Sequence, residues 1–500
     1  MATLNEGQAR TNITNFIGLN QYGNPLNGDP RYASESRNME TIGGMLQPCA
    51  ACTLLTPPLD HPIETLARLY RRWYATEAEK EVLIAASDGQ LYALIPGDTP
   101  APTVWTLLDL PDGWAGTEYV NNHWSWVAYE IPPEGEGDPV DVLLLSNADD
   151  GMILVRGDDL TTETVTTPKK FGVIARYAER IWGGAIPDDP DMLMYSAPYD
   201  PLDWTADIEI PEDGAGEINQ PSWDGDSFTA LHQFGQQLIA FKRTRIWRIL
   251  GTDPGEYAFK EQYGGGAPFY RTVAVDGERI FMLGTDGVRI YDGAAVQPFY
   301  QQFAYTVFQR MKQTLLDGAF GCVWNNKYYL AIPLDSTATA NNAVLIYDAV
   351  ENTWLLRDDV AVEAFLPTES ALYYTSAATP GRIWQWQEDS WTTGTAAASC
   401  EWVTPWTDLG FKNCEKSGLE LYVTVEVAAA ATLTFTVQTE KKSKIKTYAV
   451  ALPATGKSAK QKLLRFGGSF RMFRLKISST TTVPWRIIGG LQLLTELDAD

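Results

Sequence analysis

Histidine and cysteine supply most metal ligands and many catalytic bases and nucleophiles. The chain has three histidines, His61, His123 and His232, and none belongs to a His-Glu-x-x-His pair. Cys49 and Cys52 have metal-like spacing, but no second ligand pair lies near them in the sequence. We therefore expect no metal site, and we interpret the two cysteines as small residues in a loop.

The sequence motifs for nucleophilic catalysis and phosphate binding are missing or incomplete. No Gly-x-Ser-x-Gly nucleophile elbow occurs. Residues 451–458 (ALPATGKS) are one position away from a phosphate-binding P-loop. Ala451 stands where a glycine would let the loop turn tightly, and Pro453 lacks an amide donor. We expect a hairpin here, no catalytic residue and no bound cofactor.

Carboxylates gather at residues 147–150, 187–191 and 224–226. Paired carboxylates could act as the acid and base of a glycosidase at separations of about 5 Å or about 6.5–9.5 Å. They could also bind calcium, although none has the spacing of the twelve-residue calcium loop. We favour solvated loops, with an incidental calcium site and catalysis as lesser alternatives.

Closely spaced tryptophans could stack on sugars, although packing inside the fold is their commoner use. Period-2 spacing in a strand places both rings of a Trp-x-Trp pair on one face. We therefore favour packing for all of them: Trp124, Trp126, Trp384, Trp386, Trp402 and Trp406.

The charge of the chain is strongly acidic and unevenly distributed. Lys and Arg number 39 against 63 Asp and Glu, a net charge of −24. Residues 401–500 hold 14 basic and 9 acidic residues, a net of +5, which leaves −29 for residues 1–400. Such a chain is a poor candidate for gripping phosphates over its whole surface. The change of sign indicates a domain boundary near residue 400.

The N-terminus lacks the apolar segment of a signal peptide, and no run approaches the roughly 18 apolar residues that span a bilayer. Five scattered cysteines do not form a disulfide framework. We expect a protein made in a reducing cytoplasm, without membrane insertion.

Short strands dominate the pattern, and one hairpin unit recurs. Many short antiparallel strands over more than 300 residues favour an all-β chain with a β-propeller. At roughly 40–50 residues per blade, residues 61–398 would hold about six to eight blades. A pair of β-sandwiches is the alternative. The hairpin units, with Asp-Gly turns in the first three, are residues 81–95, 141–155, 279–292, 343–356 and 371–386.

The two ends of the chain predict separate elements. Residues 1–60, rich in Asn, Gly and Pro, resemble an extended arm that could add a ring-closing strand. Residues 399–500 predict a β-sandwich with strands near 402–410, 418–427, 431–438 and 470–477. Residues 301–316 have apolar residues four apart and predict a helix.

The basic segment 440–446 is interpreted as a solvated hairpin tip or, alternatively, as a contact with an acidic neighbouring subunit or a surface glycan. The candidate subunit contacts are Lys441, Lys442, Lys444 and Lys446.

Several segments in order resemble the β-propeller tail proteins of tailed bacteriophages, of the tail hub, nozzle or DNA-stabilisation type. Each is a weak structural motif, and their order carries the resemblance. They are residues 16–20 (FIGLN), 24–25, 37–39 (RNM), 43–46 (GGML), 180–182 (RIW), 194–204, 228–251, 264–293, 324–333, 346–354 and 402–410.

The resemblance implies a non-enzymatic virion protein that forms a ring around the tail axis and retains or conducts the genome. Its partners would be other copies of itself and neighbouring tail or head-to-tail connector proteins. A lumen lined by carboxylates would repel DNA phosphates, so DNA would pass without specific binding.

Two other functions stay open: a receptor-binding or glycan-degrading tail component, and a cellular scaffold propeller. A carboxylate pair beside an aromatic platform at the propeller mouth would favour the former, with Asp203/Trp204 and Trp223/Asp224 as candidates.

Overall fold

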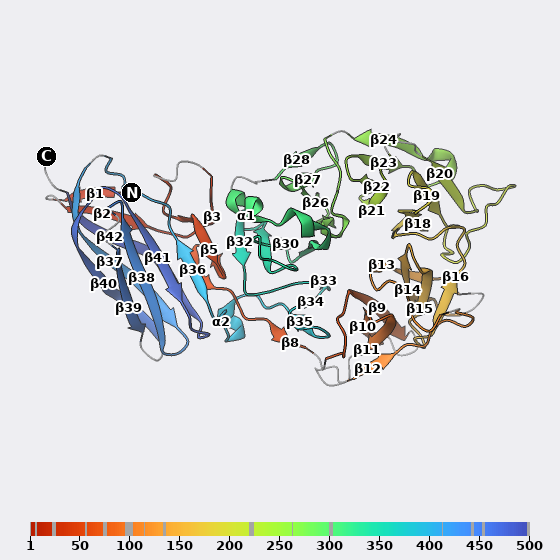
Figure 1. The fold of residues 1–500 in the computed structure, drawn as a ribbon, viewed down its shortest axis with the longest axis horizontal. Coiled ribbons are helices and arrows are strands. Elements are labelled where there is room, and N and C mark those ends of the chain that lie inside the picture. Colours follow the sequence, from red (N-terminus) through yellow and green to blue (C-terminus); the bar gives the residue numbers. More distant parts are fainter. Residues whose placement is uncertain are drawn as a thin grey trace.

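The computed structural model describes residues 2–5, 8–22, 27–55, 58–73, 78–95, 104–114, 116–133, 137–219, 225–262, 264–299, 304–412, 414–441, 445–452 and 456–497. These residues form seven sheets arranged in a ring and two further sheets packed as a sandwich at one end of the molecule (Figure 1). The prediction of an all-β chain with a propeller of six to eight blades and a β-sandwich is confirmed. No helix among the described residues is long and apolar enough to cross a membrane.

The first four blades are antiparallel four-stranded sheets that follow the chain. They comprise β9 (Thr65–Trp73), β10 (Ala78–Ser87), β11 (Gln90–Leu94) and β12 (Trp105–Leu107); β13 (Ser125–Ile131), β14 (Val140–Asn147), β15 (Gly151–Arg156) and β16 (Thr162–Val165); β17 (Val173–Tyr177), β18 (Arg180–Gly184), β19 (Met192–Tyr195) and β20 (Gly216–Asn219); and β21 (Phe228–Phe234), β22 (Gln237–Lys242), β23 (Ile246–Leu250) and β24 (Ala258–Gln262).

The last three blades follow in the same way, and two of them take strands from the N-terminal arm. They comprise β25 (Ala274–Val275), β26 (Ile280–Gly284), β27 (Gly287–Tyr291) and β28 (Val296–Pro298); β29 (Phe320–Trp324), β30 (Lys327–Ile332), β31 (Ala343–Asp348) and β32 (Thr353–Arg357), extended by β3 (Gly18–Leu19) and β4 (Tyr32–Ala33); and β33 (Ala364–Pro367), β34 (Leu372–Thr375) and β35 (Ile383–Gln385), completed by β8 (Thr53–Leu54).

Buried apolar clusters between neighbouring blades hold the ring together. The last cluster joins Leu366 and Ile383 of blade 7 to Leu66 and Leu83 of blade 1, and β33 packs against β9. The central strands of a blade are therefore buried on both faces, as in β31, where all six residues are buried. This explains the strands that lack a polar face in the sequence.

The five predicted hairpins are all present, as β10–β11, β14–β15, β26–β27, β31–β32 and β34–β35. In the first, Asp88 (φ 49°) and Gly89 (φ 69°) both occupy the left-handed region. That is the geometry of a type I′ turn, which matches the twist of the two strands it joins.

The sandwich has a seven-stranded and a five-stranded sheet. The first contains β1 (Ala2–Asn5), β2 (Gln8–Ile13), β6 (Met39–Ile42), β7 (Met45–Pro48), β37 (Lys416–Val427), β40 (Gly456–Phe470) and β42 (Trp485–Leu497). The second contains β5 (Glu35–Arg37), β36 (Cys400–Val403), β38 (Ala431–Thr439), β39 (Ile445–Leu452) and β41 (Phe473–Ser479). Five of these strands come from the arm, which the sequence analysis did not assign to the sandwich.

Three local predictions were wrong. Within the described residues 304–316, the helix expected over 301–316 is limited to α1 (Tyr305–Arg310), because Met311 adopts an extended conformation and bridges Leu334. A 3-10 turn, η4 (Gln313–Gly318), follows. Residues 404–410 do not continue β36. The described residues of 451–458 do not pair with each other as a hairpin, since Ala451 and Leu452 of β39 pair with β38 and residues 456–458 of β40 pair with β37. Residues 453–455 lie outside the described residues.

The arm joins the sandwich to the propeller. Phe16 packs edge-on against Trp402 of β36 at 5.6 Å, and the neighbouring β3 pairs with β32 of blade 6. The Asn38 amide nitrogen donates to Asp358 Oδ1 (2.8 Å) and to the Ser399 carbonyl (2.7 Å). One buried apolar cluster runs from blades 5 and 6 into the sandwich. The two domains therefore share a core.

Candidate functional site

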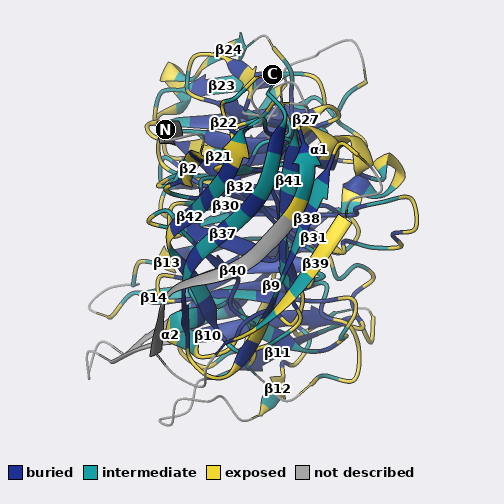
Figure 2. Ribbon diagram, turned by 90° about the vertical axis from the view of Figure 1, so that its left-hand side faces the viewer, coloured by how far each residue is buried: buried dark blue, intermediate teal, exposed yellow. Residues whose placement is uncertain are grey.

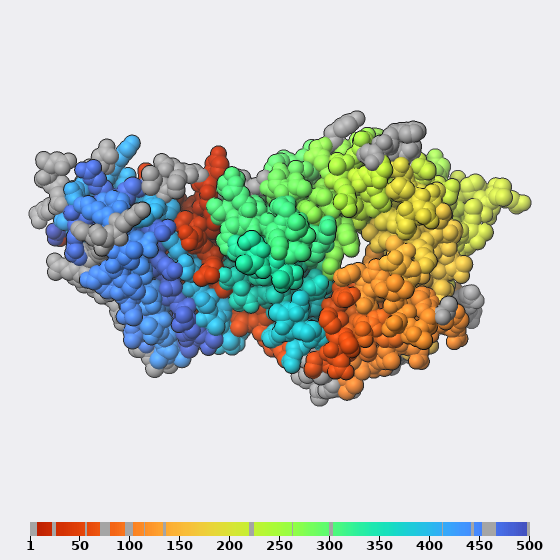
Figure 3. All heavy atoms as spheres, in the orientation of Figure 1, coloured from red at the N-terminus to blue at the C-terminus, as the bar shows by residue number. Residues whose placement is uncertain are grey.

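A cavity of about 410 Å³ opens at the centre of the propeller, where most of the inner strands begin (Figure 3). Its lining comes from all seven blades, because the first strand of each blade faces the central axis. Residues from Thr65 in blade 1 to Ala364 in blade 7 contribute. A concave site of this volume is in the range that holds a small ligand.

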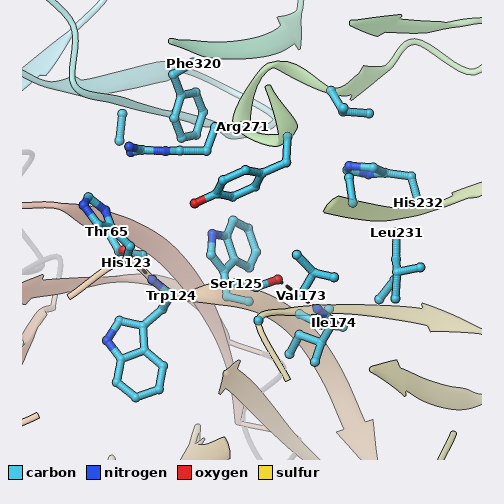
Figure 4. Close-up of a pocket in the computed structure, with 18 of the residues that line it drawn as sticks. Thr65, His123, Trp124, Ser125, Val173, Ile174, Leu231, His232, Arg271 and Phe320 are labelled. Atoms are coloured by element: carbon cyan, nitrogen blue, oxygen red, sulfur yellow. Dashed lines mark hydrogen bonds between the residues drawn. The ribbon is translucent and has the colours of Figure 1, made fainter. Parts of the chain in front are cut away.

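The cavity combines aromatic walls with a few polar groups. Trp126, Tyr270 and Phe320 line it, and Tyr270 is 42% exposed. The Arg271 guanidinium lies 5.0 Å from the centre of the Phe320 ring, and His232 lies across the cavity from both residues (Figure 4). A flat or apolar ligand could stack on these rings while its polar edge contacts Arg271.

The two imidazoles in the cavity are held in their neutral form. Burial lowers the pKa of His232 to about 4. Burial, followed by the positive charge of Arg271, lowers the pKa of His123. At neutral pH both rings therefore act as uncharged hydrogen-bonding groups rather than as cations.

The cavity lacks the geometry of a nucleophile or an acid–base pair. Ser125 Oγ accepts a hydrogen bond from the Ile174 amide at 3.0 Å instead of meeting an imidazole. Glu64 is the one carboxylate among the described lining residues, so a pair of carboxylates is not present there. This arrangement of aromatic faces, one guanidinium and neutral imidazoles can bind a ligand.

A second polar cluster is buried where the arm meets blades 6 and 7. Gln47 Nε2 donates to Glu40 Oε1 and to Asp389 Oδ1, both at 2.8 Å. Nearby, Arg357 forms a two-point ion pair with Asp359 and lies over the Trp386 ring. Burial raises the pKa of Glu40 to about 7. These contacts fix the arm against the propeller.

The two described residues among the predicted subunit contacts, Lys441 and Lys446, lie at the β38–β39 hairpin of the sandwich. β38 and β39 form a hairpin around segment 440–446, as expected. Lys441 is exposed and paired with Glu415 at 2.7 Å. Lys446 is exposed on β39, and its amino group lies 4.9 Å from the Tyr448 ring centre. Lys442 and Lys444 lie outside the described residues.

The other candidate residues are distributed through the fold. Cys49 is buried and Cys52 is partly buried; both are free thiols. Asp189 and Asp191 of the 187–191 cluster pair with Lys169 and Lys242. Among the described residues, no group of three or more His, Cys, Asp and Glu side chains is placed to hold a metal ion.

The 147–150 cluster caps a turn, because Asp150 accepts from the amides of Val120 and Asn121. Asp226 accepts from Thr244. Trp204 is buried and does not line the central cavity, so Asp203 and Trp204 form no platform at the propeller mouth. Trp223 and Asp224 lie outside the described residues.

The closely spaced tryptophans are mainly packing residues, and two of them also line the cavity. Trp124, Trp386 and Trp402 are buried, and Trp384 stacks on Tyr374. Trp406 is half-buried, with the Arg474 guanidinium 5.2 Å from its ring centre. Trp124 and Trp126 line the cavity.

Sequence reasoning missed Arg176, His232 and Arg271 as channel residues. Arg176 and His232 lie on the first strand of a blade, and Arg271 lies in the 3-10 turn η2 (Tyr270–Thr272) just before one. Their common signal is this position at the start of a four-strand unit, which could be recognised only after the blades had been counted.

Comparison with known proteins finds no family and only distant structural similarity. No family model and no curated protein matches the chain. The WD40 domain of Pan2 from Neurospora crassa is 10% identical, with a TM-score of 0.36 and coverage of 66% of this chain and 90% of that chain. BBS1N in complex with ARL6DN is 8% identical, with a TM-score of 0.40 and coverage of 68% and 97%.

The β-propeller domain of the Trilobed protease from Pyrococcus furiosus, which has an open velcro topology, is 12% identical, with a TM-score of 0.32 and coverage of 68% and 95%. At these identities the likeness concerns the propeller fold alone.

Proposed function

We propose that this chain is a non-enzymatic structural component of a bacteriophage tail, of the hub or nozzle type. Several copies assemble as a ring around the tail axis. The proposal is carried by the arm, whose strands pair into two propeller sheets and both sandwich sheets. A chain joined in this way resists separation of its domains, which suits a part of a particle that is exposed to mechanical force.

The segments that resemble the tail-protein family support this role by their positions. FIGLN places Phe16 on Trp402, and Gly18 lies against Thr353 of blade 6. RNM places Asn38 between Asp358 and the start of the sandwich. The resembling arm residues are thus the ones that make the joints between the domains.

The genome would pass between copies rather than through a propeller. The propeller cavity is small, about 410 Å³, and is lined by aromatic side chains. A DNA duplex is too wide to pass through it, since the major groove of B-DNA alone is about 12 Å wide. Each copy carries a net charge of −24. A lumen formed by several copies would therefore repel phosphates and let DNA pass without a specific site.

The remaining partners follow from this role: neighbouring tail or head-to-tail connector proteins, in a virion assembled in the host cytoplasm. The protein needs no cofactor, metal ion or membrane insertion for this function.

The second candidate function is receptor or glycan binding by a tail component. The channel cavity favours it, because Trp126 and Tyr270 offer faces for stacking on a sugar beside Arg271. In this reading the cavity binds without cleavage. Glycan-array binding that is lost in Trp126→Ala would support it.

Immunogold electron microscopy of tailed particles tests the principal proposal. Antibodies raised against the purified chain should label one defined position on the tail. A chain absent from purified particles would overturn the proposal.

A further inference from the structure

The loop between β19 and β20, residues 198–214, exposes an unusual amount of apolar surface. Ile208 is 93% exposed and Ile210 is 51% exposed, and Tyr199 and Leu202 of the same loop are also exposed. The blade 3 loop, as we name residues 198–214, projects at the end of the molecule opposite the sandwich (Figures 1 and 3). Neighbouring exposed apolar side chains of this kind mark interaction sites.

The blade 3 loop is also strongly acidic. Its 17 residues include six carboxylates and no lysine or arginine: Asp200, Asp203, Asp207, Glu209, Glu212 and Asp213. No ion pair joins any of them to a basic side chain within the described part of the chain. The isoleucines are therefore surrounded by negative charge.

A buried arginine holds the blade 3 loop in one shape. Arg180 is 1% exposed, and its Nη1 donates to the carbonyls of Ser196 (2.8 Å) and Gly214 (2.6 Å), while Nη2 donates to the carbonyl of Glu212. Trp204 is buried against Phe171. A loop fixed in this way loses little conformational entropy when it docks.

The opposite end of the molecule carries the complementary charge. Residues 441–470 include eight lysines and arginines and no aspartate or glutamate. They run through β39 and β40, which are the edge strands of the two sandwich sheets. We call the described side chains Lys441, Ile445, Lys446 and Tyr448 the basic edge; Ile445 is 58% exposed, and β39 is largely exposed (Figure 2).

We propose that the blade 3 loop of one copy docks on the basic edge of the next copy. Ile208 and Ile210 would pack on the exposed edge of β39 at Ile445, with Asp207 and Glu209 facing Lys441 and Lys446. This deepens the proposed function, because it names the contact that builds the ring.

Charge decides between the possible arrangements. A loop-to-loop contact would place twelve carboxylates together, and an edge-to-edge contact would place two basic segments together. Like charges across an interface are strongly unfavourable, whereas the head-to-tail contact joins opposite charges. Since the two surfaces differ and lie at opposite ends, the contact is heterologous, and it closes into a ring or extends into a filament.

Paired charge reversals test the contact on the full-length chain. Asp207→Lys/Glu209→Lys and Lys441→Glu/Lys446→Glu should each weaken self-association by at least about tenfold in sedimentation velocity, because each variant then faces its own charge. An equimolar mixture of the two variants should associate again, since the reversed loop of one variant meets the reversed edge of the other, and the two unaltered surfaces meet as in the wild type. Asp253→Lys/Glu256→Lys, on another exposed propeller loop, should associate like the wild type.

Wild-type-like association of both reversed variants, or a mixture that fails to associate, would overturn the contact. A wild-type chain that stays monomeric at every accessible concentration would do the same. Immunogold labelling distinguishes failure of this contact from failure of the proposed function. If the chain is present on the tail but both charge-reversed variants assemble like the wild type, the proposed function stands and this contact is wrong.

Discussion

Two buried charged residues, one on the arm and one in blade 3, influence the pH dependence of stability and the local rigidity of this protein. Glu40, on the arm, accepts a hydrogen bond from Gln47 but is buried, and burial raises its carboxyl pKa to about 7. Arg180, in blade 3, meets three backbone carbonyls rather than a carboxylate. Each residue therefore carries an electrostatic cost that can be measured.

Glu40 should make stability fall as pH rises. Below about pH 4.5 the carboxyl is protonated in both the folded and the unfolded chain, so it costs nothing. Between pH 4.5 and 7 the unfolded chain releases the proton while the folded chain keeps it, and the free energy of unfolding falls. From a pKa of about 7 against an ordinary 4.5, the full cost above pH 7 is on the order of 3 kcal/mol.

Glu40→Gln should remove this loss and stabilise the protein by about 1–3 kcal/mol at pH 8. Urea unfolding from pH 5 to 8 measures it, with exposed Glu256→Gln as the control. His232 acts in the opposite direction below pH 6.5, because burial lowers its pKa to about 4, and subtracting the two curves cancels its contribution. Parallel curves for wild type and Glu40→Gln would contradict the assignment.

Arg180→Lys should destabilise blade 3 and release its loop. A lysine ammonium is a single point of charge and cannot satisfy three carbonyls in the geometry of a guanidinium. We expect a loss of about 2–4 kcal/mol in urea unfolding and faster proteolysis within residues 205–213. Unchanged stability together with unchanged proteolysis would show that the loop is held by other contacts.

At the scale of elements, the central feature is the close approach of the arm to blade 6. A side chain on Gly18 would place its Cβ 1.6 Å from Thr353 Oγ1, and Gly18 has φ +149°. Gly43, in the turn between β6 and β7, also has a positive φ (+56°), but no atom lies within 4 Å of its Cβ position. A side chain at Gly18 would suffer both steric crowding and backbone strain, whereas one at Gly43 would suffer backbone strain alone. Comparing the two positions therefore isolates the effect of crowding.

Gly18→Ala should cost about 3 kcal/mol or more, because the methyl group forces β3 away from β32. Gly43→Ala should cost about 1 kcal/mol, the penalty for a left-handed alanine. Hydrogen exchange should show faster exchange in β3 and β32 for the first variant alone. Equal effects of the two substitutions would mean that the arm is not packed as described.

The sequence predicted hairpins well because their turns are local. The Asp88-Gly89 pair predicts a turn from its two residue types alone, without information from the rest of the chain. The sequence predicts only a range for the blade count because the connections vary in length. The arm strands were not assigned to the sandwich, since pairings such as Ser36 with Trp402 join residues hundreds of positions apart.

Candidate sites formed by residues close together in the sequence can be predicted, whereas sites that gather residues from distant positions cannot. The basic segment 441–446 is visible as a run of lysines. The channel cavity gathers Thr65, Trp126, His232 and Arg271 from separate blades, and no spacing in the sequence relates them. The helix over 301–316 was overestimated, because apolar periodicity does not reveal that Met311 bridges Leu334.

At the scale of the whole molecule, charge and shape act together. The acidic blade 3 loop and the basic edge lie at opposite ends of a body whose two domains share a core. That arrangement favours a repeating head-to-tail contact and leaves a net charge of −24 on each copy to face solvent or a lumen. Higher salt should weaken the assembly, since its contacts are charged.

The most direct test is cryo-EM of the purified assembly, with native mass spectrometry to count its copies. We predict a closed ring of fixed copy number, with the blade 3 loop of each copy on the sandwich of the next and an acidic axial surface. A monomer under all conditions, or a ring whose axial surface is basic, would contradict the account.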